Sequence, residues 1–185
     1  MRIRITATCL VLCGLAPVAI MALLGSEAWG EQAWATVTSK EGRFSIEMPG
    51  QPAKTETHQK SFVGTVTNHI FTAESGKDTF TLDYSDIPHF ALEFAGSDTI
   101  YEHAKGALLK QTFGKATSYA DVTVSGTKGK RLIYDTPPVP GHPEMRGDAI
   151  LVLVGTRLYV IDGVVPEAEA DAKSQRFLSS LAITK

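Results

Sequence analysis

The chain has 185 residues, with 18 Lys and Arg against 20 Asp and Glu and a formal net charge of −2. Hydrophobic residues make up 43% of it and charged residues 21%, proportions typical of a globular domain. It contains no basic block or basic face, so the composition argues against nucleic acid and against an anionic membrane surface as partners.

The first 30 residues differ in composition from the rest. Arg2 and Arg4 precede an apolar run at residues 7–24, and small residues follow it. This order is typical of a secretory signal peptide, with a cut after Ala28 or after Gly30. A run of this length also approaches the lower limit for a membrane-spanning helix, so an uncleaved anchor in the inner membrane is the alternative. We therefore expect a periplasmic or secreted protein, in which the membrane is contacted only through this segment.

Both cysteines of the chain, Cys9 and Cys13, lie in this segment. Residues 31–185 therefore contain no thiol for a disulfide, a nucleophile or a metal site. The residues around Cys13 loosely resemble a lipidation motif, but Leu12 is larger than the residue such a motif places before its cysteine. Without the first 30 residues, 16 basic residues face 19 acidic ones, a formal charge of about −3.

The first half of residues 31–185 predicts strands. Residues 33–38 and 43–48 read as two short strands, the second with the alternation of a half-buried strand. Residues 61–73 and 79–86 predict a hairpin whose second strand directs Phe80, Leu82 and Tyr84 to one side.

A helix is predicted next, from a possible capping box at Thr99 and Glu102 to a stop at Gly114. Two strand pairs follow, at residues 117–125 with 129–135 and at residues 146–154 with 157–164. The last pair is apolar without alternation, so both faces must be covered and these strands should be central. A second helix is predicted to open at Pro166.

This order of elements predicts one α+β domain at residues 31–185, after a signal peptide or anchor at residues 1–30. We expect an antiparallel sheet of about six to eight strands with helices packed on it, similar to an α/β/α sandwich. The connections along the chain are of hairpin length, which favours antiparallel neighbours.

Several stretches carry a family resemblance. They are GRFSIEMPGQP after a tryptophan-bearing first strand, a strand ending in YSDIP, VSGTKGKRLIYD, GTRLYVI and a closing RFLSSLAI. In this order they resemble secreted bacterial domains of unassigned function, whose element order is similar to the PsbP/Mog1-like fold. The resemblance implies a fold shared by accessory and interaction proteins, including a photosystem subunit and a partner of a small GTPase. It is carried by turns and strand ends, and it implies no catalytic residues.

The sequence lacks the readable enzyme motifs, including G-x-S-x-G, H-E-x-x-H, the P-loop and G-x-G-x-x-G. We therefore predict no catalytic residue, no cofactor and no metal site. His58 and His69 could approach each other across a strand pair, but most histidines are simply solvated. Asp83 is expected to be solvated on the polar face of its strand, and Asp162 to reach water through a bulge or strand end.

Two regions are candidates for contact with a ligand or partner. Phe90 and Phe94 lie between a predicted strand and the predicted helix, where a partly exposed apolar loop would suit partner binding. Most aromatic residues of this kind fill the core, which is the favoured alternative. The proline-rich stretch TPPVPGHPEMRG at residues 136–147 predicts a stiff connector whose His142, Glu144 and Arg146 face water. The hypothesis is an exported, non-enzymatic accessory module that binds an envelope protein or a small ligand. The alternative is an envelope hydrolase or transferase whose site is assembled from distant residues.

Overall fold

The computed structural model describes residues 32–61, 64–141 and 143–184. The contacts from residue 31 onward define one compact unit. The predicted signal or anchor segment lies outside the described residues.

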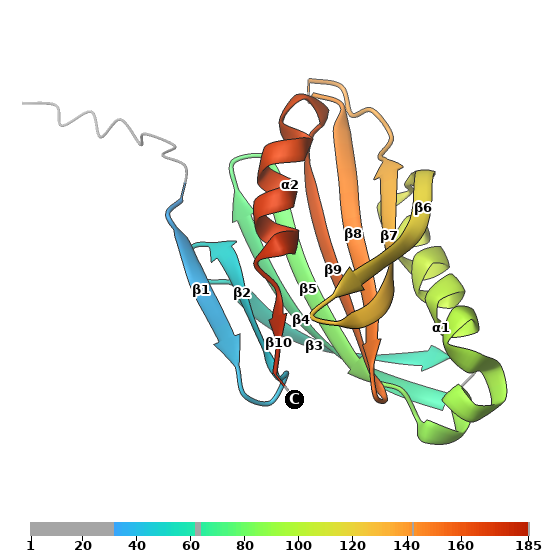
Figure 1. Cartoon of the computed structure of the whole chain (residues 1–185). Helices are drawn as coiled ribbons and strands as arrows, with labels where there is room; N and C mark the ends of the chain where they lie inside the picture. The colour runs from blue at the N-terminus through green and yellow to red at the C-terminus, as the bar shows by residue number, and fades with distance from the viewer. Residues whose placement is uncertain (1–31, 62–63, 142, 185) are drawn as a thin grey trace, which may run out of the picture. The chain divides into compact units, whose positions relative to one another are not determined.

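Within the described part of the chain, seven strands form one antiparallel sheet in the order β3-β4-β5-β9-β8-β7-β6 (Figure 1). They are β3 (Ala53–Ser61), β4 (Gly64–Ser75), β5 (Asp78–Asp86), β6 (Lys115–Val124), β7 (Thr127–Asp135), β8 (Met145–Val154) and β9 (Arg157–Pro166). A second sheet has the order β1-β2-β10 and consists of β1 (Trp34–Ser39), β2 (Phe44–Pro49) and β10 (Ala182–Ile183).

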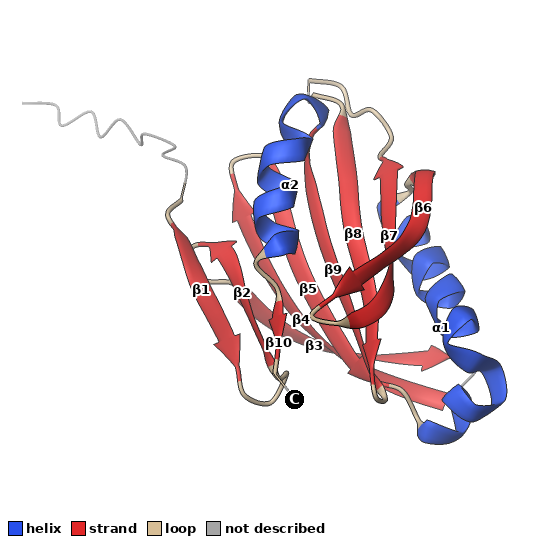
Figure 2. Cartoon of the chain, in the orientation of Figure 1, coloured by secondary structure: helices blue, strands red, loops and turns tan. Residues whose placement is uncertain are grey.

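Helices lie on both faces of the seven-stranded sheet (Figure 2). On one face, α2 (Ala170–Ser179) and the small sheet enclose a core that joins Phe44, Phe80 and Phe177. On the other face, α1 (His89–Thr112) covers part of the sheet and buries Ile100 against residues of β7 and β8. The predicted α+β class and the layered arrangement are therefore confirmed.

The two strands predicted to be central are internal in the sheet. β9 pairs with β5 on one side and β8 on the other, and β8 pairs in turn with β7. Residues 149–152 of β8 are all buried. The apolar run without alternation therefore arises because side chains on both faces of β8 are covered.

The first helix begins earlier than predicted. α1 opens at His89, and Gly96 interrupts it with φ 75° and ψ 164°, a conformation that glycine adopts without strain. The stretch from Phe90 to Phe94, predicted to be a loop, is therefore the first segment of this helix. Burial of Ile87 and Ala91 against the sheet holds this segment down, a tertiary contact that the sequence pattern did not reveal.

The end of α1 was predicted correctly. Phe113 adopts a left-handed conformation, and the amide of Gly114 donates a 2.9 Å hydrogen bond to the carbonyl of Leu109. At the second helix, Pro166 ends β9 instead of opening α2, and a short 3₁₀ turn, η1 (Glu167–Glu169), comes between.

Two strands were not predicted. β3 is an edge strand whose described side chains are exposed, so it lacks the apolar alternation of a half-buried strand. β10 contains two residues and exists only through its pairing with β2. Neither helix in the described part of the chain has the length and apolar character needed to cross a bilayer.

Candidate functional site

The proline-rich connector contains one of the candidate contact sites, and its arginine is already engaged within the protein. Arg146 lies on β8, where its Nε is 3.4 Å from Oδ1 of Asp135 and its guanidinium also pairs with Glu167. Glu144 is exposed, and its backbone carbonyl accepts a 2.9 Å hydrogen bond from the amide of Glu167. The arginine therefore fastens the connector to η1, contrary to the expectation of a charge that only faces water. His142 lies outside the described residues.

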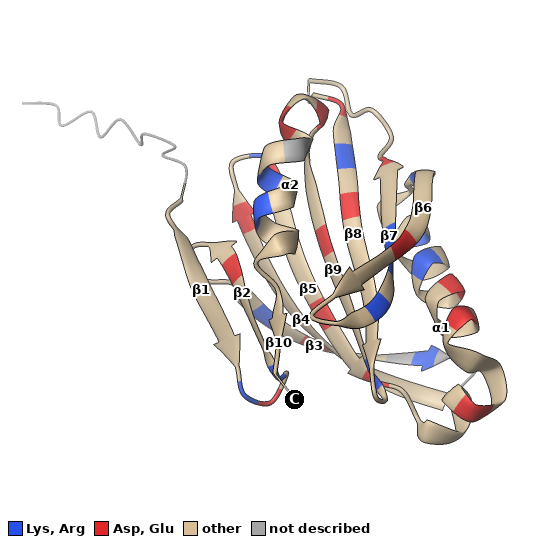
Figure 3. Ribbon diagram, viewed as in Figure 1, with Lys and Arg blue, Asp and Glu red and all other residues tan. Residues whose placement is uncertain are grey.

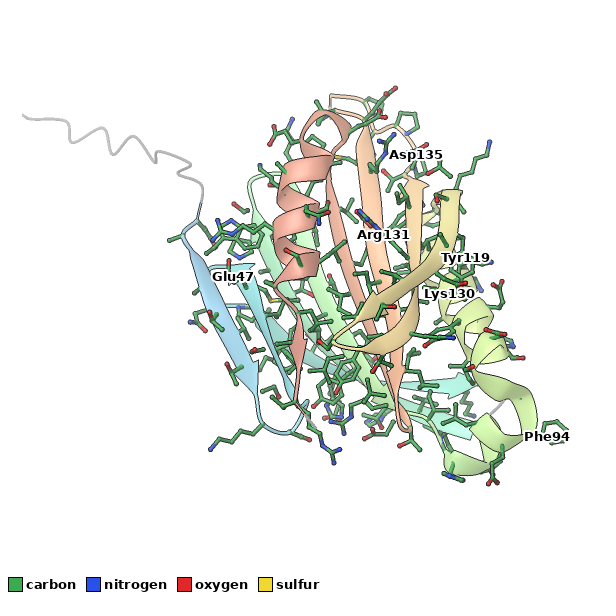
Figure 4. All side chains as sticks on the ribbon, viewed as in Figure 1. Glu47, Phe94, Tyr119, Lys130, Arg131 and Asp135 are labelled. Carbon is green, nitrogen blue, oxygen red and sulfur yellow. The ribbon has the colours of Figure 1, made fainter. Side chains whose placement is uncertain are left out.

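The second candidate site is the first segment of α1. Phe94 is 94% exposed and Phe90 is 64% exposed, and the two are one helical turn apart. Figure 4 shows the Phe94 ring projecting away from the ribbon of α1. Between them, Glu93 lies 3.4 Å from Nδ1 of His89. The sequence placed these two rings in a loop and favoured a core position for them, whereas both are exposed on the first segment of α1.

The first two thirds of α1 are acidic. Residues 89–104 contain Glu93, Asp98 and Glu102 and neither lysine nor arginine. Figure 3 shows the acidic bands on this part of α1, with basic bands farther along the helix. A shallow hollow of about 360 Å³ lies here, lined by Asp98, Thr99, Glu102 and His103.

A larger hollow of about 490 Å³ lies between α1 and the β6–β7 hairpin. Its floor is fixed by the hydroxyl of Tyr101, which donates to the carbonyl of Lys128 at 3.1 Å and accepts from the amide of Leu153 at 3.0 Å. Asp98 lines both hollows, so they adjoin. The charges of the larger one are balanced, because two aspartates and two lysines are among its lining residues.

Beside this hollow, Tyr119 on β6 lies between two lysines. The Nζ atoms of Lys105 and Lys130 are 4.3 and 5.8 Å from its ring centroid, and Lys130 also pairs with Asp121 at 2.5 Å (Figure 4). Burial, as the main cause, and the nearby carboxylate of Glu102 together raise the pKa of Tyr119 to about 12. Sequence reasoning missed this cluster, whose members come from α1 and two strands and share no motif.

Two carboxyl groups differ from their predicted environments. Asp162 takes part in regular pairing on β9, opposite Thr81 and Ala149, and is 6% exposed instead of reaching water at a bulge or strand end. Asp83 is half-buried. In both, Oδ1 is buried without a hydrogen-bond partner among the described residues. Burial raises the pKa of Asp83 to about 7 and, as the main cause, that of Asp162 to about 7 as well.

The two histidines expected to approach each other do so. Nε2 of His58 and Nδ1 of His69 lie 3.6 and 3.7 Å from the two carboxylate oxygens of Glu56. His58 also forms a 3.0 Å hydrogen bond with Thr67. Among residues 32–61, 64–141 and 143–184, however, no three His, Cys, Asp or Glu side chains are arranged to hold a metal ion.

These strands and helices form a PsbP-like fold, the class that the sequence resembles. The chain is similar to cyanobacterial PsbP (CyanoP) from Synechocystis sp. PCC 6803, with a TM-score of 0.56 and 14% sequence identity over 86% of this chain and 98% of that one. It is also similar to a crystal structure from Bacteroides thetaiotaomicron, with a TM-score of 0.50 and 12% identity over 81% of this chain and 48% of that one. No family model and no curated protein matches the sequence. The structural similarity establishes the fold, and at identities this low it leaves the function open.

Proposed function

We propose that this chain is an exported accessory module that binds another protein of the cell envelope through the first half of α1. The observation that carries the proposal is the exposure of Phe94, at 94%, together with that of Phe90, at 64%, one turn apart on the same helix. Large aromatic side chains that are exposed together, with charged groups around them, are typical of protein interfaces.

The energetics favour burial of this pair in a complex. Covering a fully exposed phenylalanine contributes about 1.5 to 3 kcal/mol. The segment that carries the rings is anchored to the sheet through Ala91, which is 2% exposed. The rings are therefore presented on an ordered helix, and little conformational entropy is lost when a partner covers them.

Export is supported by the sequence of the first 30 residues, with Arg2 and Arg4 before the apolar run at residues 7–24. We propose that this segment is a signal peptide and that the module acts outside the cytoplasm. Mass spectrometry of the protein from the cells that produce it would show the mature N-terminus. An intact N-terminus in the membrane fraction would show an anchor instead.

Binding is favoured over catalysis by the positions of the two unusual acids. Carboxyl groups with a raised pKa are often catalytic, because they can exchange protons near neutral pH. Asp162, however, is 6% exposed within the sheet. Neither Asp83 nor Asp162 lines the larger hollow, so the hollow and the perturbed acids do not form one site.

The test is site-specific photocrosslinking in the producing cells, with p-benzoylphenylalanine at position 94. The matched control carries the same group at Phe113, which is 80% exposed at the other end of α1. We expect a discrete protein adduct from position 94 that is absent from position 113. Absence of an adduct from position 94 would remove the proposal.

A further inference from the structure

We infer that the partner segment bound by the first half of α1 is both basic and apolar, with aliphatic or aromatic side chains flanked by lysine or arginine. This inference rests on the proposed function and specifies its partner. It joins two observations on residues 89–104 of α1, the exposed rings of Phe90 and Phe94 and the presence of three acids without a lysine or arginine.

The carboxylates on this surface are incompletely neutralised within the chain. Glu93 pairs with the imidazole of His89, which is charged only when protonated. Asp98 has no ion pair among the described residues, although Lys130 lies across the adjoining hollow and interacts with it electrostatically. Glu102 pairs with Lys105, but it remains exposed, with a side-chain accessibility of 55%. A cation that approaches the aromatic pair therefore meets Glu93 and Asp98 without a lysine or arginine paired to either, while Lys105 and Lys130 offset part of the charge of Glu102 and Asp98.

The shape of the surface fits a basic side chain. Asp98 and Glu102 are four residues apart in the helical segment after Gly96, so they share a face. They line the hollow of about 360 Å³ together with Thr99 and His103, and no lysine or arginine contributes to that lining. The side chain of a lysine or arginine can lie in this hollow.

The same charges argue against a lipid surface as the occupant. Exposed aromatic rings can insert into a bilayer interface, but anionic headgroups attract lysine and arginine and repel carboxylates. Residues 89–104 of α1 carry three acids and no lysine or arginine, so a membrane would meet repulsion where a basic segment meets attraction.

The inference is tested with two short peptides of the same length, one of leucine and lysine and the other of leucine and glutamate. Binding is measured by calorimetry, and the contacted residues are identified from amide chemical shifts. We expect the lysine peptide to bind at α1 and the glutamate peptide to bind at least about tenfold more weakly. Affinity for the lysine peptide should fall as ionic strength rises to the physiological value.

Three variants separate the contributions. Phe94→Ser should lower the affinity for the lysine peptide by about tenfold. The combined change Glu93→Gln, Asp98→Asn and Glu102→Gln should lower this affinity by a similar factor and remove most of its dependence on salt. Phe113→Ser, the matched control at the other end of α1, should leave its affinity unchanged. Thermal unfolding of each variant confirms that it is folded.

Three results would overturn the inference: equal binding of the two peptides, a lysine-peptide affinity unchanged by both test variants, or tight binding of the protein to phosphatidylglycerol vesicles. The crosslinking experiment keeps this inference distinct from the proposed function. An adduct at position 94 whose partner segment lacks lysine and arginine would refute the basic partner and leave protein binding established. Absence of an adduct would refute the proposed function, whatever the peptides do.

Discussion

The phenolic hydroxyl of Tyr134 on β7 donates a 2.7 Å hydrogen bond to Oδ2 of Asp162 on β9, across the intervening strand β8. The contact is possible because β8 has small residues at this place, Gly147 opposite Tyr134 and Ala149 opposite Asp162. The hydrogen bond satisfies one carboxyl oxygen, and Oδ1 stays buried without a partner among the described residues. The carboxyl group is therefore more stable protonated than ionised until the pH approaches 7.

Asp162 should make the stability of the protein depend on pH. Its pKa is raised from 3.8 to about 7 in the folded state, so the unfolded state releases the proton first as the pH rises. The stabilisation by the protonated group is complete below about pH 4 and is lost progressively as the pH rises to about 7. Above about pH 7 this group causes no further change in stability. Urea denaturation at pH 5 and pH 8 should show a decrease of a few kcal/mol in the free energy of unfolding.

The contribution of Asp162 is isolated by Asp162→Asn, which keeps the shape of the side chain and cannot ionise. Its unfolding free energy should vary less between pH 5 and pH 8 than that of the wild type. Asp83, whose pKa burial also raises to about 7, should retain a part of the dependence in this variant. If the two proteins show the same pH profile, Asp162 is already ionised at pH 5 and the explanation is wrong.

Gly147→Ala should be strongly destabilising. A Cβ at this position would lie 2.0 Å from Cζ of Tyr134, closer than real Cβ atoms approach other atoms, and the ring is held by its bond to Asp162. We expect a loss of about 3 kcal/mol or more in the free energy of unfolding. The matched control is Gly106→Ala within α1, where a Cβ meets nothing within 4 Å, and which should stabilise by about 0.5 to 1 kcal/mol. Similar values for the two variants would contradict the proposed packing.

Arg157 should be important for attachment of the turn between β1 and β2. Its Nε and Nη2 donate to the two carboxylate oxygens of Asp86 at 2.8 and 2.7 Å. Its Nη1 donates to the carbonyl of Glu41 in that turn, and the guanidinium lies 4.7 Å from the ring centroid of Tyr84. Arg157→Ala should cost about 2 to 3 kcal/mol in denaturation experiments. Arg157→Lys should recover a minority of this, because an ammonium group cannot form the planar two-pronged contact. Full recovery by lysine would show that charge alone matters.

The proline-rich connector should be dispensable for partner binding. Replacing His142, Glu144 and Arg146 together with alanine removes the contacts of Arg146 to Asp135 and Glu167, which are partly exposed. Such pairs contribute roughly 1 kcal/mol or less each, so the protein should stay folded. The yield of the adduct at position 94 should be unchanged, since α1 carries the proposed interface. A large drop in that yield with unchanged thermal stability would assign the connector to the interface.

Local sequence patterns were sufficient to predict those features that depend on residues close together in the chain. The alternation of Phe80, Leu82 and Tyr84 predicted the buried face of β5, and all three are at most 2% exposed. Gly114 marked the end of α1, because the left-handed turn that stops a helix is a short-range arrangement.

Patterns failed where long-range contacts decide the structure. The stretch around Phe90 to Phe94 has little helical amphipathicity, and its helix forms because Ala91 is buried against the sheet. The sequence favours a bulge or a strand end for Asp162, because an aspartate in an apolar run is costly to bury. Tyr134, 28 residues earlier in the chain, supplies the hydrogen bond that lowers this cost.

The sequence by itself determined the α+β class, the central position of β8 and β9 and the hypothesis of an exported protein, because these follow from composition and from periods of a few residues. The tertiary structure decided which charges are neutralised, which acids are buried and which aromatic rings stay exposed. Arg146 is paired and Phe94 is exposed because of what the fold brings beside each of them. The candidate interface on α1 is thus a property of the folded surface, since it depends on contacts that other elements make or fail to make with one helix.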